Sequence, residues 1–151
     1  MRITIIAVGR LKSGPETSLM DGYLKRLPWP VNIVEVDERR PIKGPERQAR
    51  EAELILGALP DGAMTIALDE QGKTYDSPGF AAALAHWRQH RSDHLAFLIG
   101  GADGFAPEIK SRADHKVSLG AMTWPHALAR VMLVEQLYRA HTILSGHPYH
   151  K

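Results

Sequence analysis

The sequence predicts an α/β fold with a mostly parallel sheet and helices on both of its faces. Short runs rich in β-branched residues alternate with amphipathic segments along the whole chain. The runs are apolar throughout, as in strands that are covered on both faces. No repeat or low-complexity tract interrupts the order. At 151 residues, about the length of one domain, the chain is expected to form a single domain over residues 1–151.

The first half of the chain contains two predicted strands and two predicted helices. Residues 2–8 are an apolar run that ends at a glycine, which is typical of a buried parallel strand. Residues 15–27 carry leucines and a tyrosine on one helical face, and a Pro-Trp-Pro sequence ends that helix. Residues 31–36 form the second strand. After a polar, basic loop over 38–45, residues 46–59 have the spacing of a charged amphipathic helix.

The second half continues the alternation. Residues 64–68 are the third strand, and a Ser-Pro pair opens a helix over 77–90, with the serine as N-cap and the proline in the first helical position. The fourth strand, 94–99, runs directly into a glycine-rich loop. After a short helix, a brief strand spans 116–119. The last helix, 125–145, is mostly apolar and ends at a glycine.

The composition excludes several classes of protein. The chain has no cysteine, which excludes a disulfide framework, thiolate-bound zinc and a cysteine nucleophile. The N-terminal apolar run has about five residues, too few for a signal peptide or a membrane span. We therefore expect a cytoplasmic protein without a membrane partner. A net charge of +2 and a pI of about 9.0 permit a nucleic-acid partner without requiring one.

Ligands of parallel α/β sheets bind beyond the carboxyl ends of the strands, so the loops there are the places to look for a site. The loop at 100–104, Gly-Gly-Ala-Asp-Gly, lacks the G-x-G-x-x-G spacing of a dinucleotide site, and a plain tight turn is its alternative. Residues 71–74, Gln-Gly-Lys-Thr, imitate the end of a P-loop. The first glycine of that motif is missing, which argues against ATP hydrolysis.

The histidines offer only weak metal sites. His86, His90 and His94 recur every four residues, a spacing at which two helical histidines can share a metal. No glutamate stands between the first two, and the third begins a strand, so a solvated helix face is the better interpretation. The closing His147-Pro-Tyr-His150 offers two ligands in a terminal tail, for which a frayed end is the alternative. We expect no metal.

Three segments point to function more than to packing. Residues 118–126 join a strand to the last helix through small residues and two large apolar ones, Met122 and Trp124, which could enclose an apolar or sulfonium ligand. The last helix is apolar enough to need a partner, such as a second subunit. The final three residues, 149–151, combine an aromatic ring, an imidazole with a pKa of about 6.5 and a cation.

Motifs spread over the whole chain resemble one family. They are Ile5-Ile-Ala-Val-Gly-Arg-Leu-Lys, Leu68-Asp with Gly72-Lys, Leu98-Ile-Gly-Gly-Ala-Asp-Gly-Phe105, Thr123-Trp-Pro-His126, Arg130-Val, Glu135-Gln-Leu-Tyr-Arg-Ala140 and His147-Pro-Tyr-His-Lys. In this order, and at nearly full length, the chain resembles the RlmH (formerly YbeA) family of ribosomal RNA methyltransferases. The resemblance implies a minimal SPOUT-class fold with a C-terminal trefoil knot, and a homodimer. General topology rules argue against a knot, so the resemblance alone predicts it.

The resemblance also implies the reaction. These enzymes use S-adenosylmethionine to methylate N3 of a pseudouridine in the helix 69 loop of 23S rRNA (Ψ1915) on the assembled 70S ribosome. No metal is needed, because the cofactor carries its methyl group already activated on a sulfonium. By similarity, the cofactor would lie against residues at three strand ends: Leu68, Gly100, Leu119, Gly120, Ala121, Met122, Thr123 and Trp124.

The chemistry of the acceptor assigns roles to five further residues. Pseudouridine N3 carries a hydrogen, so a base must remove it as the new bond forms. His150 suits that task near neutral pH, and Arg139 could stabilise the charge that develops on the imidate oxygen. Arg130, Tyr149 and Lys151 are the expected RNA contacts, through phosphate or base stacking. Which side chain takes the proton stays open.

Two other functions remain as alternatives. The first is a non-catalytic RNA- or ribosome-binding protein that uses the same fold and basic tail, and transfer of a labelled methyl group to ribosomes would distinguish it. The second is a Rossmann-like oxidoreductase, which the glycine spacing already disfavours. A thermal-shift comparison of S-adenosylmethionine with NAD separates it from a methyltransferase.

Overall fold

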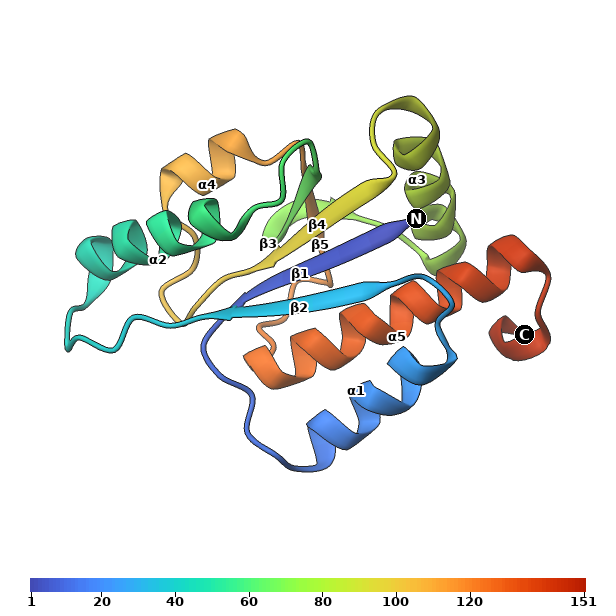
Figure 1. The fold of residues 1–151 in the computed structure, drawn as a ribbon, viewed down its shortest axis with the longest axis horizontal. Coiled ribbons are helices and arrows are strands. Elements are labelled where there is room, and N and C mark those ends of the chain that lie inside the picture. The colour runs from blue at the N-terminus through green and yellow to red at the C-terminus, as the bar shows by residue number, and fades with distance from the viewer.

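The chain folds into five strands and five α-helices that alternate along the sequence, as Figure 1 shows for residues 1–151 of this computed structural model. The strands are β1 (Arg2–Val8), β2 (Val31–Val36), β3 (Met64–Thr74), β4 (His94–Ile99) and β5 (His115–Ser118). The helices are α1 (Pro15–Arg26), α2 (Gly44–Ala58), α3 (Ser77–His90), α4 (Pro107–Arg112), α5 (His126–Ser145) and a final 3-10 turn, η1 (Pro148–His150). The predicted alternation is confirmed.

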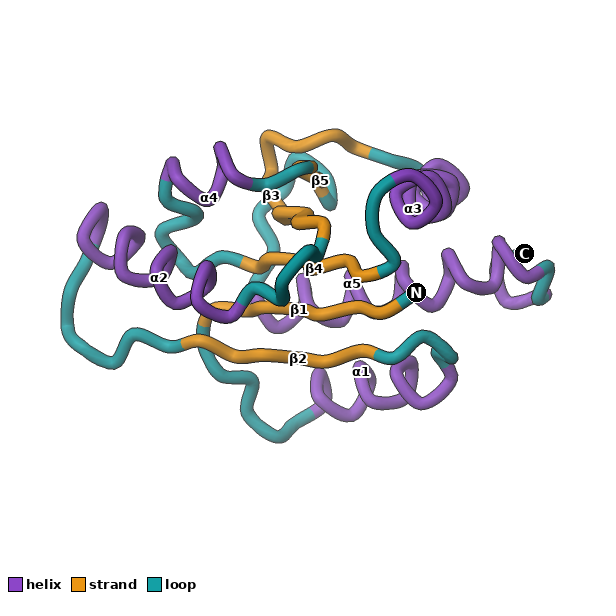
Figure 2. The backbone as a smooth tube through the Cα atoms, turned by 45° about the horizontal axis from the view of Figure 1, so that its top comes forward, coloured by secondary structure: helices purple, strands orange, loops and turns teal.

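The five strands form one sheet in the order β2-β1-β4-β3-β5, and every neighbouring pair is parallel. Phe97 of β4 lies in register with Ile5 of β1 on one side and with Ile66 of β3 on the other. Because all strands run the same way, Leu68 of β3 lies level with Ile99, the last residue of β4, and with Val117 near the end of β5. Beyond this point β3 turns and continues toward α3 (Figure 2). The strand order does not test the expected trefoil knot, which stays a prediction.

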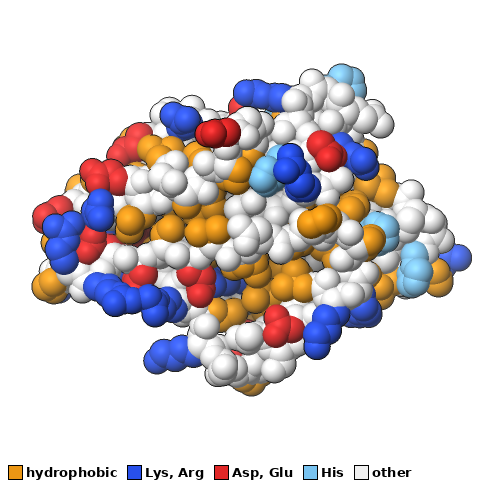
Figure 3. All heavy atoms as spheres, viewed as in Figure 1, with side chains coloured by type: hydrophobic (Ala, Val, Ile, Leu, Met, Phe, Trp, Pro, Cys, Tyr) orange, Lys and Arg blue, Asp and Glu red, His pale blue; other side chains and the backbone are white.

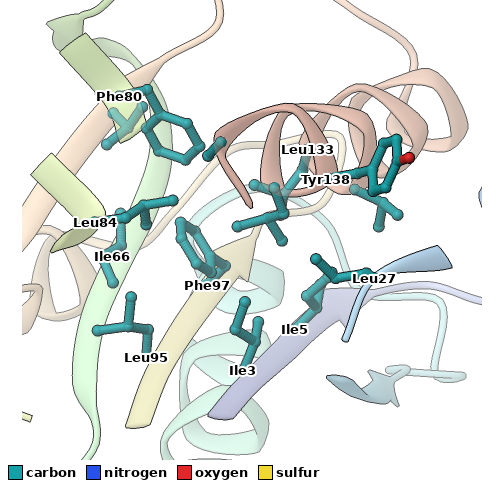
Figure 4. Close-up of a cluster of buried hydrophobic side chains, with 14 of the residues drawn as sticks. Ile3, Ile5, Leu27, Ile66, Phe80, Leu84, Leu95, Phe97, Leu133 and Tyr138 are labelled. Atoms are coloured by element: carbon teal, nitrogen blue, oxygen red, sulfur yellow. The ribbon is translucent and has the colours of Figure 1, made fainter. Parts of the chain in front are cut away.

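Helices cover both faces of the sheet and divide the interior into two cores. Successive side chains of a strand point to opposite faces. Ile5 and Phe97 therefore pack with α1, α3 and α5 in the larger core, which Figure 4 shows. Their neighbours Ile6 and Leu98 pack with α2 and α4 in the smaller one. All four side chains are at most 2% exposed, which explains why these strands are apolar throughout.

The third strand is longer than the sequence predicts. The apolar run ends at Leu68, but β3 continues to Thr74 through polar residues. Both Leu68 and Lys73 pair with Val117 of β5, so the residues between them form a bulge in the sheet edge. A Cβ atom at Gly72 would stand only 2.6 Å from the backbone of β5, so this approach requires a glycine. Polar residues at a bulged edge carry no strand periodicity, which is why the extension was missed.

The helix ends agree with the sequence in one case and correct it in another. Gly146 ends α5 in the left-handed conformation, with φ 74°, as predicted. The N-cap of α3 is Asp76, whose Oδ1 accepts a hydrogen bond from the Gly79 N–H at 2.7 Å. Ser77, the predicted cap, is the first helical residue, and its hydroxyl donates to Gln136 Oε1 instead. None of the helices combines the length and the hydropathy needed to cross a bilayer.

Candidate functional site

A cavity of about 480 Å³ opens beside residues 68–70 of β3 and the ends of β4 and β5. It lies between the loop at 100–104, which follows β4, and the loop that joins β5 to α5. Its lining contains seven of the eight residues that the sequence predicts for a cofactor: Leu68, Gly100, Leu119, Gly120, Met122, Thr123 and Trp124. Ala121, the eighth, is exposed and does not line it.

The loop between β5 and α5 is shaped by local hydrogen bonds. Gly120 has φ 118°, in the left-handed region that favours glycine. The Ser118 hydroxyl accepts from the Gly120 N–H at 3.1 Å and donates to its carbonyl at 3.0 Å. The Trp124 indole N–H donates to the Leu119 carbonyl at 3.4 Å. Met122 is nevertheless 75% exposed, so this loop presents apolar surface to a ligand or to a partner.

Two hydrogen-bonding contacts fix the conformation of the loop at 100–104, one within the loop and one from α2. Gly101 and Gly104 form a β-bridge, in which the Gly104 N–H donates to the Gly101 carbonyl at 3.0 Å. The Gln48 side chain of α2 donates to the Asp103 carbonyl. Backbone therefore forms much of this wall of the cavity, as the glycine-rich sequence predicts.

Glu51 of α2 lies beneath this glycine loop. Its position could not be predicted from the sequence, because a glutamate in an amphipathic helix normally faces solvent. The residue is only 3% exposed. Its Oε1 accepts from Arg47 Nε at 2.9 Å, and its Oε2 has no hydrogen-bond partner. Burial raises the pKa of the Glu51 carboxyl group, and Arg47 offsets that only in part.

Several polar residues line the cavity although they are not among the predicted site residues. They are Gln48, Asp69, Glu70, Asp103, Lys110 and His126. Asp69 stands out among them, because its side chain is only 6% exposed and its Oδ2 has no hydrogen-bond partner. One signal for it existed, since Asp69 directly follows Leu68 in the Leu-Asp motif. Lys110 lies on a short helix and carried no such signal.

The predicted tail residues gather around Glu135 of α5. Tyr149 donates its hydroxyl hydrogen to Glu135 Oε1 at 3.0 Å and lies 3.3 Å from the Tyr23 hydroxyl. Arg139 Nη2 donates to the same Glu135 oxygen at 2.6 Å. Burial raises the pKa of Tyr149, and the hydrogen bonds with Tyr23 and Glu135 raise it further. Arg139 and Tyr149, two residues predicted separately, are thus brought together.

His150 and Lys151 lie far from the cavity within one chain. His126, at the start of α5, lines the cavity, whereas the tail follows the other end of that helix (Figure 1). At about 1.5 Å per residue, a helix of 20 residues is about 30 Å long. His150 Nδ1 is buried without a hydrogen-bond partner. The structure therefore does not bring His150 to the cavity of its own chain.

A second cavity, of about 680 Å³, adjoins the first. Its lining includes Tyr23 and Glu135, which contact Tyr149 of the C-terminal tail, and the exposed Leu19 of α1. It shares four residues with the first cavity: Leu68, Val117, Leu119 and Gly120. The second cavity therefore connects the strand ends with the surroundings of Glu135.

Arg130, predicted as an RNA contact, lies inside the protein, which corrects that expectation. The residue is 3% exposed. Its Nη1 donates to Glu35 Oε2 at 2.6 Å, and its Nη2 donates to the Gly9 carbonyl at 2.8 Å. Burial raises the pKa of Glu35, but the hydrogen bonds from Arg130 and the Leu11 N–H outweigh it, so the net shift is downward. Arg130 therefore ties α5 to the end of β1 and to β2.

The spaced histidines take ordinary structural positions. The rings of His86 and His90 stack with their centroids 4.2 Å apart. His94 begins β4, as predicted, and its Nε2 lies 2.8 Å from the Thr4 hydroxyl. No group of three or more His, Cys, Asp or Glu side chains is placed to hold a metal ion.

Comparison with solved structures identifies the fold. The chain matches a probable methylase family protein from Haemophilus influenzae with a TM-score of 0.58 at 13% identity, over 99% of this chain and 70% of the other. It matches a ribosomal RNA small subunit methyltransferase E from Neisseria gonorrhoeae, solved with bound S-adenosyl methionine, with a TM-score of 0.50 at 15% identity. That match covers 95% of this chain and 67% of the other. Both matches extend over nearly the whole chain.

Sequence comparison identifies the family. The family model described as "Predicted SPOUT methyltransferase" matches residues 1–150. A protein of Paramagnetospirillum magneticum named "Ribosomal RNA large subunit methyltransferase H" is 52% identical over 100% of this chain and 99% of its own length. One of the same name from Rhodospirillum centenum is 49% identical over the same shares. The chain therefore belongs to the SPOUT methyltransferases and, within them, to the RlmH family of large-subunit ribosomal RNA methyltransferases.

Proposed function

We propose that the protein transfers a methyl group from S-adenosylmethionine to N3 of a pseudouridine in the helix 69 loop of 23S rRNA, within the assembled ribosome. The observation that carries this proposal is the cavity beside residues 68–70 of β3 and the ends of β4 and β5, with seven of the eight expected cofactor residues in its lining. The relatives named as large-subunit RNA methyltransferases support the class of substrate. Such a substrate would make the cytoplasm the place of action.

The residues present fit this cofactor. A volume of about 480 Å³ lies in the range of small-molecule sites. Leu119, Met122 and Trp124 offer apolar surface for an adenine ring, and the glycines at 100 and 101 let the backbone approach a ligand closely. When bound, S-adenosylmethionine supplies an activated methyl group on a sulfonium. The protein then has to hold the acceptor nitrogen in line with it and to remove one proton.

The residues of the tail supply what the acceptor needs. His150 accepts the N3 proton, and Arg139 stabilises the negative charge that develops on the neighbouring oxygen. Tyr149 stacks on a base, and Lys151 contacts a phosphate. The contact of Arg139 and Tyr149 through Glu135 supports their acting at one place. Arg130 has no part in this proposal, because its side chain is committed inside the protein.

A homodimer would bring the tail to a cofactor. Within one chain the tail follows the far end of α5 from the cavity, so the tail of the second subunit is the one that completes the site (Figure 1). Exposed apolar side chains near the cavities support such a contact: Leu19 is 53% exposed, Met122 75% and Leu128 41%. A minimal protein of this kind also gains RNA-binding surface from its partner.

Labelled methyl transfer tests the proposal directly. The protein is incubated with labelled S-adenosylmethionine and either assembled ribosomes or isolated 23S rRNA, and the RNA is digested to nucleosides. We expect label in N3-methylpseudouridine, and only with assembled ribosomes. Binding to ribosomes without transfer would indicate a non-catalytic binding protein. Label in another nucleoside would overturn the proposed acceptor.

A further inference from the structure

The cofactor cavity contains a carboxylate whose hydrogen bonding is incomplete. Asp69 follows Leu68 at the point where β3 leaves the hydrophobic core, and its side chain is 6% exposed. Its Oδ1 accepts from the Gln71 N–H at 3.0 Å, whereas its Oδ2 is buried without a hydrogen-bond partner. The nearest positive charge is Lys110 Nζ of α4, 3.6 Å from Oδ2. Asp69 and Lys110 both line the cavity.

A carboxylate in this position favours a cationic donor. Burying a charge without hydrogen bonds is costly, and a buried oxygen that lacks a donor bears most of that cost. Lys110 lies beyond hydrogen-bond distance and its side chain is 39% exposed, so it compensates Asp69 only in part. An ammonium group within the cavity would supply both a positive charge and N–H donors to Oδ2.

The lining of the cavity contains both kinds of residue that a ligand with an apolar part and a zwitterionic end would need. Its apolar members include Leu119, Met122 and Trp124. Its charged members include Asp69 and Lys110. A nucleoside that carries an amino acid has these two kinds of surface, and its ammonium and carboxylate groups need one partner of each charge.

Resting on the proposed function, we propose that Asp69 binds the α-ammonium group of the cofactor's amino-acid end and that Lys110 turns to its α-carboxylate. The buried carboxylate then keeps a positive partner in both states, Lys110 before binding and the ligand afterwards. Lysine suits the exchange, because its charge sits on a flexible stem. The pair selects adenosyl compounds that retain the amino acid over those that have lost it.

Two ligands that differ only at the amino-acid end test this inference. S-adenosylhomocysteine has that end, and 5′-methylthioadenosine keeps the adenosine and the thioether without it. Calorimetry on the parent should show that the first binds more tightly. In Asp69→Asn, the affinity for S-adenosylhomocysteine should fall by about 10- to 100-fold, the range expected for a charged hydrogen bond, with 5′-methylthioadenosine unchanged.

Two further variants make the result specific. Glu108→Gln removes a negative charge from an exposed residue of α4 that does not line the cavity, and it should leave the ratio of the two affinities unchanged. Lys110→Met should lower the affinity for S-adenosylhomocysteine about three- to tenfold without changing the affinity for 5′-methylthioadenosine. If Asp69→Asn does not fold, this variant still tests whether the pair binds the amino-acid end. Equal losses for both ligands would assign Asp69 to the adenosine part and overturn the inference. A parent that binds neither ligand would overturn the proposed function itself.

Discussion

Glu51 lies directly under Gly101, a glycine that lines the cavity beside β4. A Cβ atom at Gly101 would stand 2.8 Å from Glu51 Oε2 and 3.0 Å from Oε1. The carboxylate cannot move away freely, because Arg47 Nε holds its Oε1 at 2.9 Å. The close approach of the loop at 100–104 to α2 therefore depends on a glycine at position 101.

Gly101→Ala should lower the free energy of unfolding by about 1–3 kcal/mol, because the added methyl group overpacks a buried contact. It should also weaken cofactor binding, since the loop would shift. Glu51→Asp in the same chain shortens the opposing side chain and should recover much of both losses. Urea unfolding and calorimetry with S-adenosylhomocysteine measure the two effects. Strictly additive losses in the double variant would contradict the contact.

Glu38 gives a pH-dependent contribution to stability. Its side chain, 6% exposed, accepts hydrogen bonds from Arg40 and Arg50, at the end of the molecule where Figure 3 shows acidic and basic side chains together. These hydrogen bonds lower the pKa of Glu38 from 4.5 to about 2, and those from the Arg40 side chain have the largest effect. A carboxyl group with a lowered pKa stabilises the folded state above pH 4.5, and that contribution is lost as the pH falls towards about 2.

Glu38→Gln should therefore flatten the acid side of the stability curve. Between pH 4.5 and about 2, the parent should lose more free energy of unfolding than the variant does. Denaturant unfolding at several pH values in this range measures the difference. Glu35 and Asp93, whose pKa values are also lowered, contribute equally to both proteins. Parallel curves would show that the Glu38 bonds carry no pH-dependent stability.

Arg130→Met should destabilise the protein without a direct effect on RNA. Removing the guanidinium leaves Glu35 and the Gly9 carbonyl without their donor, which we expect to cost about 2–3 kcal/mol of unfolding free energy. The folded variant should still bind ribosomes with parental affinity. If stability is unchanged while ribosome binding is lost, Arg130 contacts RNA after all.

The strands and the loops that line the cavity could be predicted from the sequence, because they depend on local signals. Runs such as 2–8 and 94–99 are apolar since helices cover both faces of the sheet, and the glycines at 100 and 120 mark loops where backbone approaches a ligand or adopts positive φ. Residue spacing and residue type alone indicate these features. The resemblance to one family then indicated which of these loops to expect around a cofactor.

The buried charges could not be predicted in the same way. Glu51 and Arg130 sit in helices, where a charged residue ordinarily faces water, and only the packing of α2 and α5 against the sheet buries them. Asp69 lies in the bulge of β3, between residues that pair with Val117 of the distant strand β5. Partners this distant in sequence leave no periodic signal. The same is true of the gathering of Arg139 and Tyr149 around Glu135.

The protein should be a dimer in solution. Sedimentation at micromolar concentration should give about twice 16.7 kDa, because Leu19 and Leu128 are otherwise left exposed to water. Replacing these two leucines, which do not line the first cavity, by lysine should favour the monomer. That monomer should retain S-adenosylhomocysteine binding through its own loops and lose methyl transfer. A parental protein that sediments as a monomer and still methylates ribosomes would exclude the dimer.

Two inactive chains can test whether the cavity of one subunit works with the tail of the other. Gly100→Val should close the cavity, since a Cβ atom there already stands 3.3 Å from the Phe105 ring. Deletion of residues 149–151 removes the proposed base while leaving the cavity intact. Calorimetry should show lost cofactor binding for the first chain and parental binding for the second, and each homodimer should be inactive.

The decisive measurement is single-turnover methyl transfer to ribosomes by the heterodimer of these two chains, purified through different tags. If the sites are shared between subunits, the heterodimer holds one intact site, the cavity of the truncated chain with the tail of the Gly100→Val chain. We then expect about half of the parental amount of transfer per dimer at an unchanged rate. A heterodimer as inactive as both homodimers would show that each site uses its own tail, and a tail deletion that still transfers at a rate within about threefold of the parent would remove His150 from the chemistry.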